Sequence, residues 1–224
     1  MIKALTLDLD DTLWPIEPVM LRAEVSLHTW LEAHCPEVAT AFPVPTMREL
    51  RTAVWIEHPE LQHDFTATRM ISLRRAMLPH GYNEFQVQQA FEVFYAARNQ
   101  VQLYPEVLAV LDALAARLPL VAVSNGNADL KRIGLDHYFV GAFNAREHGA
   151  AKPDPSIFLG ACAFLKCQPG QVLHVGDHPE QDAWGAMQAG LRAAWLNRHE
   201  AAWPFEQAPD HDIPTLQPLL SLCR

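Results

Sequence analysis

The sequence predicts an α/β protein: a doubly wound, parallel, Rossmann-like sheet with an α-helical cap domain inserted into it. Two observations predict this class. Short apolar segments alternate with helical segments in the second half of the chain, as right-handed βαβ crossovers require. A long segment with helical spacing separates them from the first apolar segment. We therefore expect the α/β core in residues 1–13 and 98–224 and the cap in residues 14–97.

The first predicted strand is "IKALTL", residues 2–7, an apolar segment too short to form an independent helix. Directly behind it, "DLDDT" places Asp8, Asp10, Asp11 and Thr12 at the carboxyl end of the strand. Three carboxylates within so few residues repel one another, so we expect a positive charge beside them. A calcium-binding EF-hand loop does not fit, because that pattern needs a glycine and a glutamate at positions where this chain has neither.

The insert is predicted to be helical throughout. Apolar residues recur at helical spacing, as at Leu27 and Leu31, and "VQQAFEVFYAAR" continues the pattern. Proline and glycine breaks at "CPEV", "FPVP", "EHPEL" and "PHGYN" divide the segment into about four helices with no strand. Because the insert begins directly after the acidic cluster, we expect it to cover that cluster as a cap.

The second half of the chain supplies the other predicted strands. "YPEVLAVLDALAARLP" is a helix, followed by strands at "LVAVSNGN" and "GAFNARE". "PSIFLGACAFL" is a helix, "QVLHVGD" a strand, "EQDAWGAMQAG" a helix and "RAAWLN" a fifth strand. In such a sheet the ligand site lies beyond the carboxyl ends of the strands.

Polar residues gather at these strand ends. Ser124 and Asn125 follow the second strand, Lys152 lies in "AKPDP" before a helix, and Asp177 follows "VLHV", with Asp182 further along. Taken singly, the serine could cap a helix, the lysine could be solvated, and the two aspartates could belong to a turn and a helix start. Their joint placement instead favours one shared pocket.

The four motifs "DLDDT", "VAVSNGN", "AKPDP" and "GDHPEQD", in this order, resemble those of the haloacid dehalogenase (HAD) superfamily of phosphohydrolases. The resemblance implies a Mg²⁺-dependent phosphomonoester hydrolase. Asp8 would be the nucleophile that forms an aspartyl phosphate, a covalent route open to carboxylates. Asp10 would protonate the leaving oxygen and then deprotonate water.

The resemblance also implies the remaining roles. Asp8, the backbone carbonyl of Asp10, and Asp177 would hold Mg²⁺, with Asp182 supporting them. The other polar residues at the strand ends would act on the phosphoryl group and its surroundings. Ser124 and the amide of Asn125 would bind phosphoryl oxygens, Lys152 would balance charge, and Thr12 would order the loop.

A fuller resemblance, which extends through the insert, is to bacterial phosphatases that act on flavin mononucleotide (FMN) and on 5-amino-6-(5-phosphoribitylamino)uracil in riboflavin biosynthesis. "LTLDLDDTLW", "HDFTATRMISLRRAML", "GLDHYFVGAFNAREHGAAKP" and "VLHVGDHPEQDAWGAMQAGLRAAWL" carry it. A broad nucleotide or sugar phosphatase and a sugar-phosphate mutase remain alternatives. A phospho-receiver module fits poorly, because Lys152 precedes Asp177 and receivers place the lysine last. Dehalogenation needs no second acid, so Asp10 favours phosphate ester hydrolysis.

Several residues have open interpretations. Trp14 could stack on a flavin ring or pack the cap hinge, and Arg69 and Arg74 could face the substrate or form a solvated helix face. His178 could act directly, could hydrogen-bond to the metal ligands or could simply be exposed.

Bulk composition limits the partners. With a net charge of −9 and scattered lysines and arginines, the chain lacks the basic footprint of a nucleic-acid-binding protein. Its four cysteines form no CxxC pair and are expected to be reduced thiols. No signal peptide or long apolar run is visible, so we expect a cytoplasmic protein without membrane contact that binds a small phosphorylated substrate. The oligomeric state is open.

Overall fold

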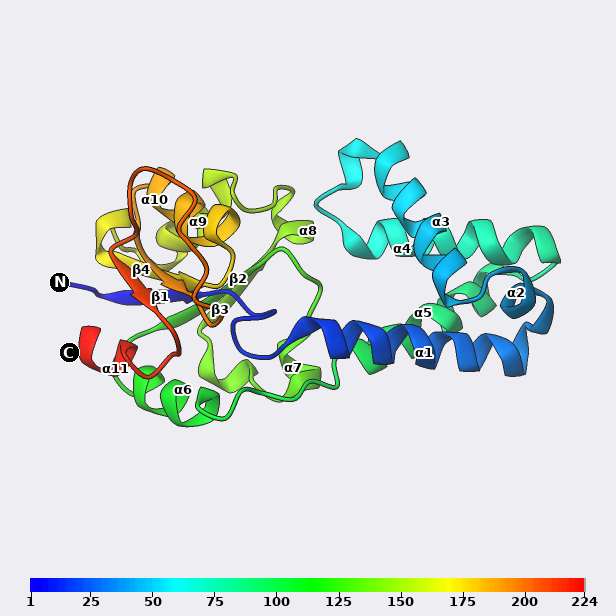
Figure 1. The fold of residues 1–224 in the computed structure, drawn as a ribbon, viewed down its shortest axis with the longest axis horizontal. Coiled ribbons are helices and arrows are strands. Elements are labelled where there is room, and N and C mark those ends of the chain that lie inside the picture. The colour runs from blue at the N-terminus through cyan, green and yellow to red at the C-terminus, as the bar shows by residue number, and fades with distance from the viewer. Residues whose placement is uncertain (224) are drawn as a thin grey trace. The chain divides into compact units, whose positions relative to one another are not determined.

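The computed structural model describes residues 1–223 (Figure 1). The chain forms two compact units. One comprises Met1–Pro15, Gln102–Gly126 and the segment from Gly134 on, and the other comprises Ile16–Val101 and Asn127–Ile133. We call the first the α/β unit and the second the helical unit.

The α/β unit is built on a six-stranded sheet with the order β3-β2-β1-β4-β5-β6, and all paired strands are parallel. The strands are β1 (Ala4–Leu7), β2 (Leu120–Ser124), β3 (Gly141–Asn144), β4 (Val172–Gly176), β5 (Arg192–Leu196) and β6 (His211–Ile213). The predicted α/β class is confirmed. The sequence analysis missed β6, because an edge strand of three residues with two polar side chains carries no apolar pattern.

Strand β1 lies in the middle of the sheet, where its four residues are buried. Leu7 pairs with Ala122 of β2 and with Val175 of β4. The N–H of Asp8 continues this ladder by donating to the carbonyl of Val175 at 2.9 Å. The carboxyl ends of β1, β2 and β4 therefore meet at one edge of the sheet, as the parallel arrangement requires.

Helices of the α/β unit connect and cover these strands. They are α6 (Val107–Ala115), α8 (Ala145–His148), α9 (Pro155–Leu165), α10 (Gly185–Gln188) and α11 (Leu219–Leu222), with short helical turns η3 (Asp136–Tyr138), η4 (Pro169–Gln171) and η5 (Pro179–Trp184). Helix α9 begins at a proline after Asp154, whose side chain accepts a hydrogen bond from the N–H of Ser156. Its apolar face packs Ile157 and Phe158 into the main core of the unit.

The helical unit contains α1 (Ile16–His34), α2 (Pro36–Ala41), α3 (Val44–Glu57), η1 (Pro59–Leu61), α4 (Phe65–Met77), η2 (Leu78–His80), α5 (Glu84–Arg98) and α7 (Leu130–Ile133). Four of these helices are long, and α1 and α5 lie alongside each other (Figure 1). Asp64 caps α4, and Asn83 with Gln86 forms a capping box at α5. Leu27 and Leu31 of α1 are buried in the core of this unit.

Helix α7 follows β2 in the chain but belongs to the helical unit. The N–H of Asp129 donates to Oδ1 of Asn99 at 2.7 Å, and Arg132 forms an ion pair with Glu92.

Among the residues that the structure describes, no helix has the length and apolarity needed to cross a membrane.

Candidate active site

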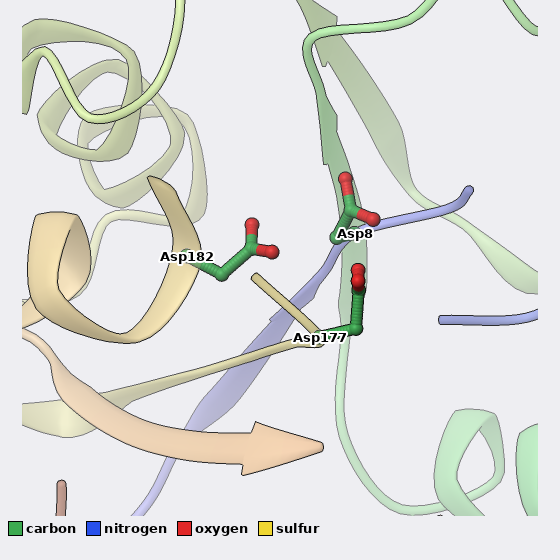
Figure 2. Close-up of side chains that lie close together, drawn as sticks. All are labelled: Asp8, Asp177 and Asp182. Atoms are coloured by element: carbon green, nitrogen blue, oxygen red, sulfur yellow. The ribbon is translucent and has the colours of Figure 1, made fainter. Parts of the chain in front are cut away.

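Three carboxylates meet at the carboxyl edge of the sheet. Asp8 follows β1, Asp177 follows β4, and Asp182 lies in η5. Figure 2 shows these side chains close together, and one oxygen from each lies within 4.8 Å of the others. Asp182 approaches the end of β4 so closely that a Cβ atom at Gly176 would lie 2.3 Å from its carboxyl carbon. Glycine at residue 176 is therefore required for this arrangement.

Lys152 lies between two of the carboxylates. Its Nζ donates to Oδ1 of Asp8 and to Oδ1 of Asp182, both at 2.5 Å, and to the carbonyl of Val123 at 2.8 Å. Burial lowers the pKa of Lys152, but Asp182 and Asp8 outweigh this effect and hold it above its usual value. The buried ammonium is therefore charged and fully hydrogen-bonded, unlike a solvated loop lysine.

Both oxygens of Asp182 are occupied by donors. Oδ1 also lies 3.2 Å from Nε2 of His174, and Oδ2 accepts the N–H of His178 at 2.9 Å. Burial raises the pKa of Asp182, but Lys152 and His174 outweigh burial and hold the pKa well below its usual range. Asp182 thus orients Lys152, while Asp8 and Asp177 supply the oxygens that face each other.

Thr12 joins the two remaining carboxylates. Its hydroxyl lies 3.2 Å from Oδ2 of Asp8 and 3.3 Å from Oδ1 of Asp177. Burial raises the pKa of Asp8 well above its usual value although Lys152 opposes it, and burial together with Asp182 and Asp11 raises the pKa of Asp177 to about 7. The single positive charge of Lys152 does not balance the negative charges of the three carboxylates.

This donor set fits a hard divalent cation. Carboxylate oxygens are the ligands that Mg²⁺ prefers, and a cation would offset both the burial and the repulsion that raise the pKa values of Asp8 and Asp177. Asp8 and Asp177 would hold it. The structure therefore contains an acidic cluster of the kind that the sequence analysis expected, with Asp182 in a supporting place.

Asp10 lies in a tight turn behind β1. Its Oδ1 accepts the indole N–H of Trp14 at 2.9 Å, and the N–H of Asp11 donates to the carbonyl of Trp14 at 2.7 Å. Asp11 has a φ of 58°, in the left-handed region that aspartate tolerates better than most residues. Trp14 is fully buried. It therefore packs and orients Asp10, and its ring is not exposed for stacking on a flavin.

Ser124 and Asn125 organise the loop after β2. The Ser124 hydroxyl accepts the N–H of Gly126 at 3.0 Å, which closes a local turn rather than capping a helix. The Asn125 side chain accepts the N–H of Lys152 at 2.7 Å and donates to its carbonyl at 2.9 Å. It also donates to Gln181 at 3.0 Å. Asn125 thus fixes the backbone that carries the lysine, a role that its neighbourhood in the sequence did not indicate.

Two histidines of this region have different positions. His178 is exposed, and its Nδ1 accepts the N–H groups of Glu180 and Gln181, so it caps η5. His174 is completely buried, between Asp182 and the hydroxyl of Thr6, which lies 2.9 Å from its Nδ1. The sequence analysis did not select His174. The signal was a histidine inside the otherwise apolar strand "VLHV".

The buried His174 predicts a pH dependence of folding stability. Burial lowers its pKa below the 6.5 of the unfolded chain, against the opposing effect of Asp182. Below that pH the unfolded chain binds one more proton, so stability falls as pH falls, by about 1.4 kcal/mol per pH unit. We expect His174→Gln to remove this part of the dependence in urea unfolding from about pH 8 to about pH 5. His137→Gln, at an exposed site, is the control, and identical slopes in all three proteins would contradict the assignment.

The fold and the site together define the class of protein. The chain belongs to the haloacid dehalogenase-like hydrolases, whose family model matches residues 2–190. It is similar to the 5-amino-6-(5-phospho-D-ribitylamino)uracil phosphatase YigB of Escherichia coli (strain K12), with 33% identity over 99% of this chain and 96% of that protein. Phosphoserine phosphatase of Thermus thermophilus is 35% identical over 64% of this chain and 60% of its own length.

A solved structure is also similar along the whole chain. The crystal structure of a 2-haloacid dehalogenase from Pseudomonas syringae pv. Tomato DC3000 superposes with a TM-score of 0.92 at 41% identity, covering 99% of this chain and 98% of that one. The resemblance found in the sequence is confirmed at the level of the family, and the chain is classed with the phosphatases of that family. Membership of this family does not by itself identify the substrate.

Proposed function

We propose that this protein is a Mg²⁺-dependent phosphomonoester hydrolase that works through an aspartyl phosphate on Asp8. One observation carries the proposal. The Asp8 carboxylate stands at the end of the central strand, with Lys152 2.5 Å from one oxygen, Thr12 3.2 Å from the other, and Asp177 beside it. A carboxylate oriented in this way is suited to in-line attack on phosphorus.

The proposed reaction has two steps. An oxygen of Asp8 attacks phosphorus, the ester P–O bond breaks, and Asp10 gives its proton to the leaving alcohol. Asp10 then takes a proton from a water that attacks the same phosphorus, which breaks the bond to Asp8 and releases inorganic phosphate. Trp14 orients Asp10 throughout, and Lys152 balances charge at the phosphoryl group. When bound, Mg²⁺ would be held by Asp8 and Asp177 and would neutralise phosphoryl charge.

The proposed substrates are 5-amino-6-(5-phosphoribitylamino)uracil and FMN. The full-length similarity to the Escherichia coli phosphatase, which includes the helical unit, supports this choice. We propose the insert, residues 14–97, as a cap that supplies substrate specificity. A broad nucleotide or sugar phosphatase and a sugar-phosphate mutase are the alternatives within the same chemistry.

Dehalogenation is a second candidate, because the similar solved structure is described as a 2-haloacid dehalogenase. In that reaction Asp8 would attack carbon, and the halide would leave as an anion that needs no proton. The oriented Asp10 would then have no role in the departure of the leaving group. The hydrogen bond from Trp14 to Asp10 therefore favours phosphate esters.

A substrate panel tests the proposal. Phosphate release would be measured with the ribitylaminouracil phosphate, FMN, pyrimidine nucleotides and sugar phosphates, each with Mg²⁺ and with EDTA, alongside chloride release from 2-chloropropionate. We expect kcat/KM at least about tenfold higher for the first two substrates, and activity that is lost with EDTA and restored by Mg²⁺. Equal rates on all phosphates would reduce the function to a broad phosphatase. Conversion to an isomeric phosphate without phosphate release would indicate a mutase, and chloride release alone a dehalogenase.

A further inference from the structure

Two side chains at the end of β5 contact the loops that carry the acidic cluster. The indole N–H of Trp195, inside β5, donates to the backbone carbonyl of Asp177 at 2.7 Å. Arg198, two residues past the strand, donates from Nη2 to the backbone carbonyl of Thr12 at 3.0 Å. We call Trp195 and Arg198 the β5 clamp. Both lie beyond residues 2–190, so the family match assigns a role to neither.

The two carbonyls belong to residues that set the geometry of the acidic cluster. The Thr12 hydroxyl lies 3.2 Å from Oδ2 of Asp8 and 3.3 Å from Oδ1 of Asp177. Thr12 and Asp177 both lie beyond the ends of their strands, so sheet pairing does not extend to them. The backbone positions of these two residues therefore govern the separation of the two carboxylates that would hold Mg²⁺.

Arg198 is itself held in place from two further sides. Its Nη1 lies 2.8 Å from Oε1 of Glu106, and its guanidinium carbon lies 3.7 Å from the centre of the Tyr104 ring. The Arg198 and Glu106 side chains are 12% and 7% exposed. Burial raises the pKa of Glu106, but hydrogen bonds from its own backbone and from Arg198 outweigh burial and hold the pKa below its usual value. Arg198 is therefore a fixed donor, unlike a solvated surface arginine.

Trp195 is equally fixed. It is 2% exposed and pairs with Gly176, the residue directly before Asp177, in the parallel ladder of β4 and β5. Its ring lies 5.2 Å from that of Trp203, whose own N–H donates to the carbonyl of Gln207 at 2.9 Å. A buried indole N–H that lost its acceptor would be costly, so the hydrogen bond to Asp177 is strongly favoured.

We infer that the β5 clamp positions Asp8 and Asp177 for Mg²⁺ by fixing the backbone of Thr12 and of Asp177. The inference rests on the proposed function, because it takes the Mg²⁺ site from that proposal. Carboxylates that repel one another have to be held together before a cation binds, and the clamp would supply that constraint. Groups that orient metal ligands from outside contribute about 10-fold to 100-fold to metal affinity. Trp195 and Arg198 are thus positioning residues.

The sign of the effect separates positioning from simple electrostatics. Arg198 carries a positive charge, which opposes the binding of a cation, so loss of that charge alone would strengthen Mg²⁺ binding. Loss of positioning has the opposite effect, because Thr12 would no longer hold the two carboxylates at a fixed separation. Weaker Mg²⁺ binding to Arg198→Met is therefore expected only if the arginine acts through Thr12.

Mg²⁺ binding to the full chain without substrate would be measured by isothermal titration calorimetry. The variants are Trp195→Phe and Arg198→Met, and each has a matched control. Trp203→Phe removes an indole N–H that donates to a carbonyl outside the site, and Arg117→Met removes an exposed arginine that donates to a carbonyl elsewhere in the α/β unit. We expect the Kd for Mg²⁺ to rise at least about tenfold in Trp195→Phe and at least about threefold in Arg198→Met. Both controls should stay within about twofold of the wild type.

Phosphate release at increasing Mg²⁺ separates positioning from loss of folded protein. In Trp195→Phe we expect the half-saturating Mg²⁺ concentration to rise at least about tenfold, with kcat at saturation within about threefold of the wild type. Partial unfolding would instead lower kcat at every Mg²⁺ concentration, and the Tm would reveal it. If Arg198→Met does not fold because Glu106 loses its partner, the double variant Glu106→Gln/Arg198→Met serves instead, with the same weakening expected.

The outcomes distinguish the inference from the proposed function. A wild type that binds no Mg²⁺ would overturn both. If the wild type binds Mg²⁺, an unchanged Kd in Trp195→Phe and Arg198→Met, tighter binding to Arg198→Met, or equal losses in the two controls would each overturn the inference and leave the proposed function in place.

Discussion

An Asp8→Asn variant is expected to lose phosphate release by at least about 10,000-fold while keeping its fold, the size of effect seen when the nucleophile of a covalent mechanism is removed. The amide is a poor nucleophile and cannot form the acyl phosphate. The substitution does not strand a buried charge, because Lys152 keeps its 2.5 Å contact with Asp182. Single-turnover phosphate release and the Tm by circular dichroism would be measured on the same preparation.

Asp11→Asn is the matched control for this variant. It changes the same functional group three residues further on, and asparagine tolerates the left-handed backbone at that position. We expect its activity to stay within about threefold of the wild type. An Asp8→Asn enzyme that kept more than about 1% of Mg²⁺-dependent turnover, or an equal loss in Asp11→Asn, would remove Asp8 from the role of nucleophile.

The second large effect is expected for Asp10→Asn. General acid and base catalysis contributes about 100-fold to 10,000-fold, so steady-state turnover of alkyl phosphates should fall by that factor. With p-nitrophenyl phosphate, whose leaving group needs no proton, the first step should survive while attack by water slows. We therefore expect a burst of nitrophenol equal to the enzyme concentration, followed by slow turnover, observed by stopped-flow absorbance.

The loss of activity in Asp10→Asn is to be compared with the loss in a Trp14→Phe variant. It keeps the carboxylate and removes only the indole donor that lies 2.9 Å from Oδ1. We expect a loss of at most about tenfold, because orientation is weakened while the proton donor remains. If Asp10→Asn shows equal losses on alkyl and nitrophenyl phosphates without a burst, Asp10 has no role in proton transfer.

The fold class and the grouping of polar residues at strand ends could be predicted because both depend on local patterns. Apolar segments alternating with helices indicate parallel strands, and parallel strands place their carboxyl ends together. Asp8, Lys152 and Asp177 could therefore be expected at one edge before any distance was known. Strand β6 could not be predicted, because its three residues form a strand through pairing with β5 and carry no strand pattern in their own sequence.

The individual partners of the site residues could not be predicted, because they depend on side chains far apart in the chain. Lys152 contacts a carboxylate 144 residues away, and the hydroxyl of Thr6 approaches His174 across 168 residues. Local pattern suggested only that Trp14 could stack or pack, and its complete burial decided between these possibilities. Arg69 is 6% exposed and lies over the Phe94 ring, and this burial could not be predicted, because a helix sequence does not state which neighbours will cover each face.

The sequence by itself thus determined the α/β class, the helical insert and the residue types that gather at the strand ends, because hydrophobic periodicity and strand direction are local properties. Only the tertiary structure decided that Asp182 orients Lys152, that Trp14 holds Asp10, and that Arg69 is buried against the Phe94 ring. The physical reason is that hydrogen bonds, desolvation and charge balance depend on distances of a few ångströms between distant segments, and those distances exist only once the chain has packed.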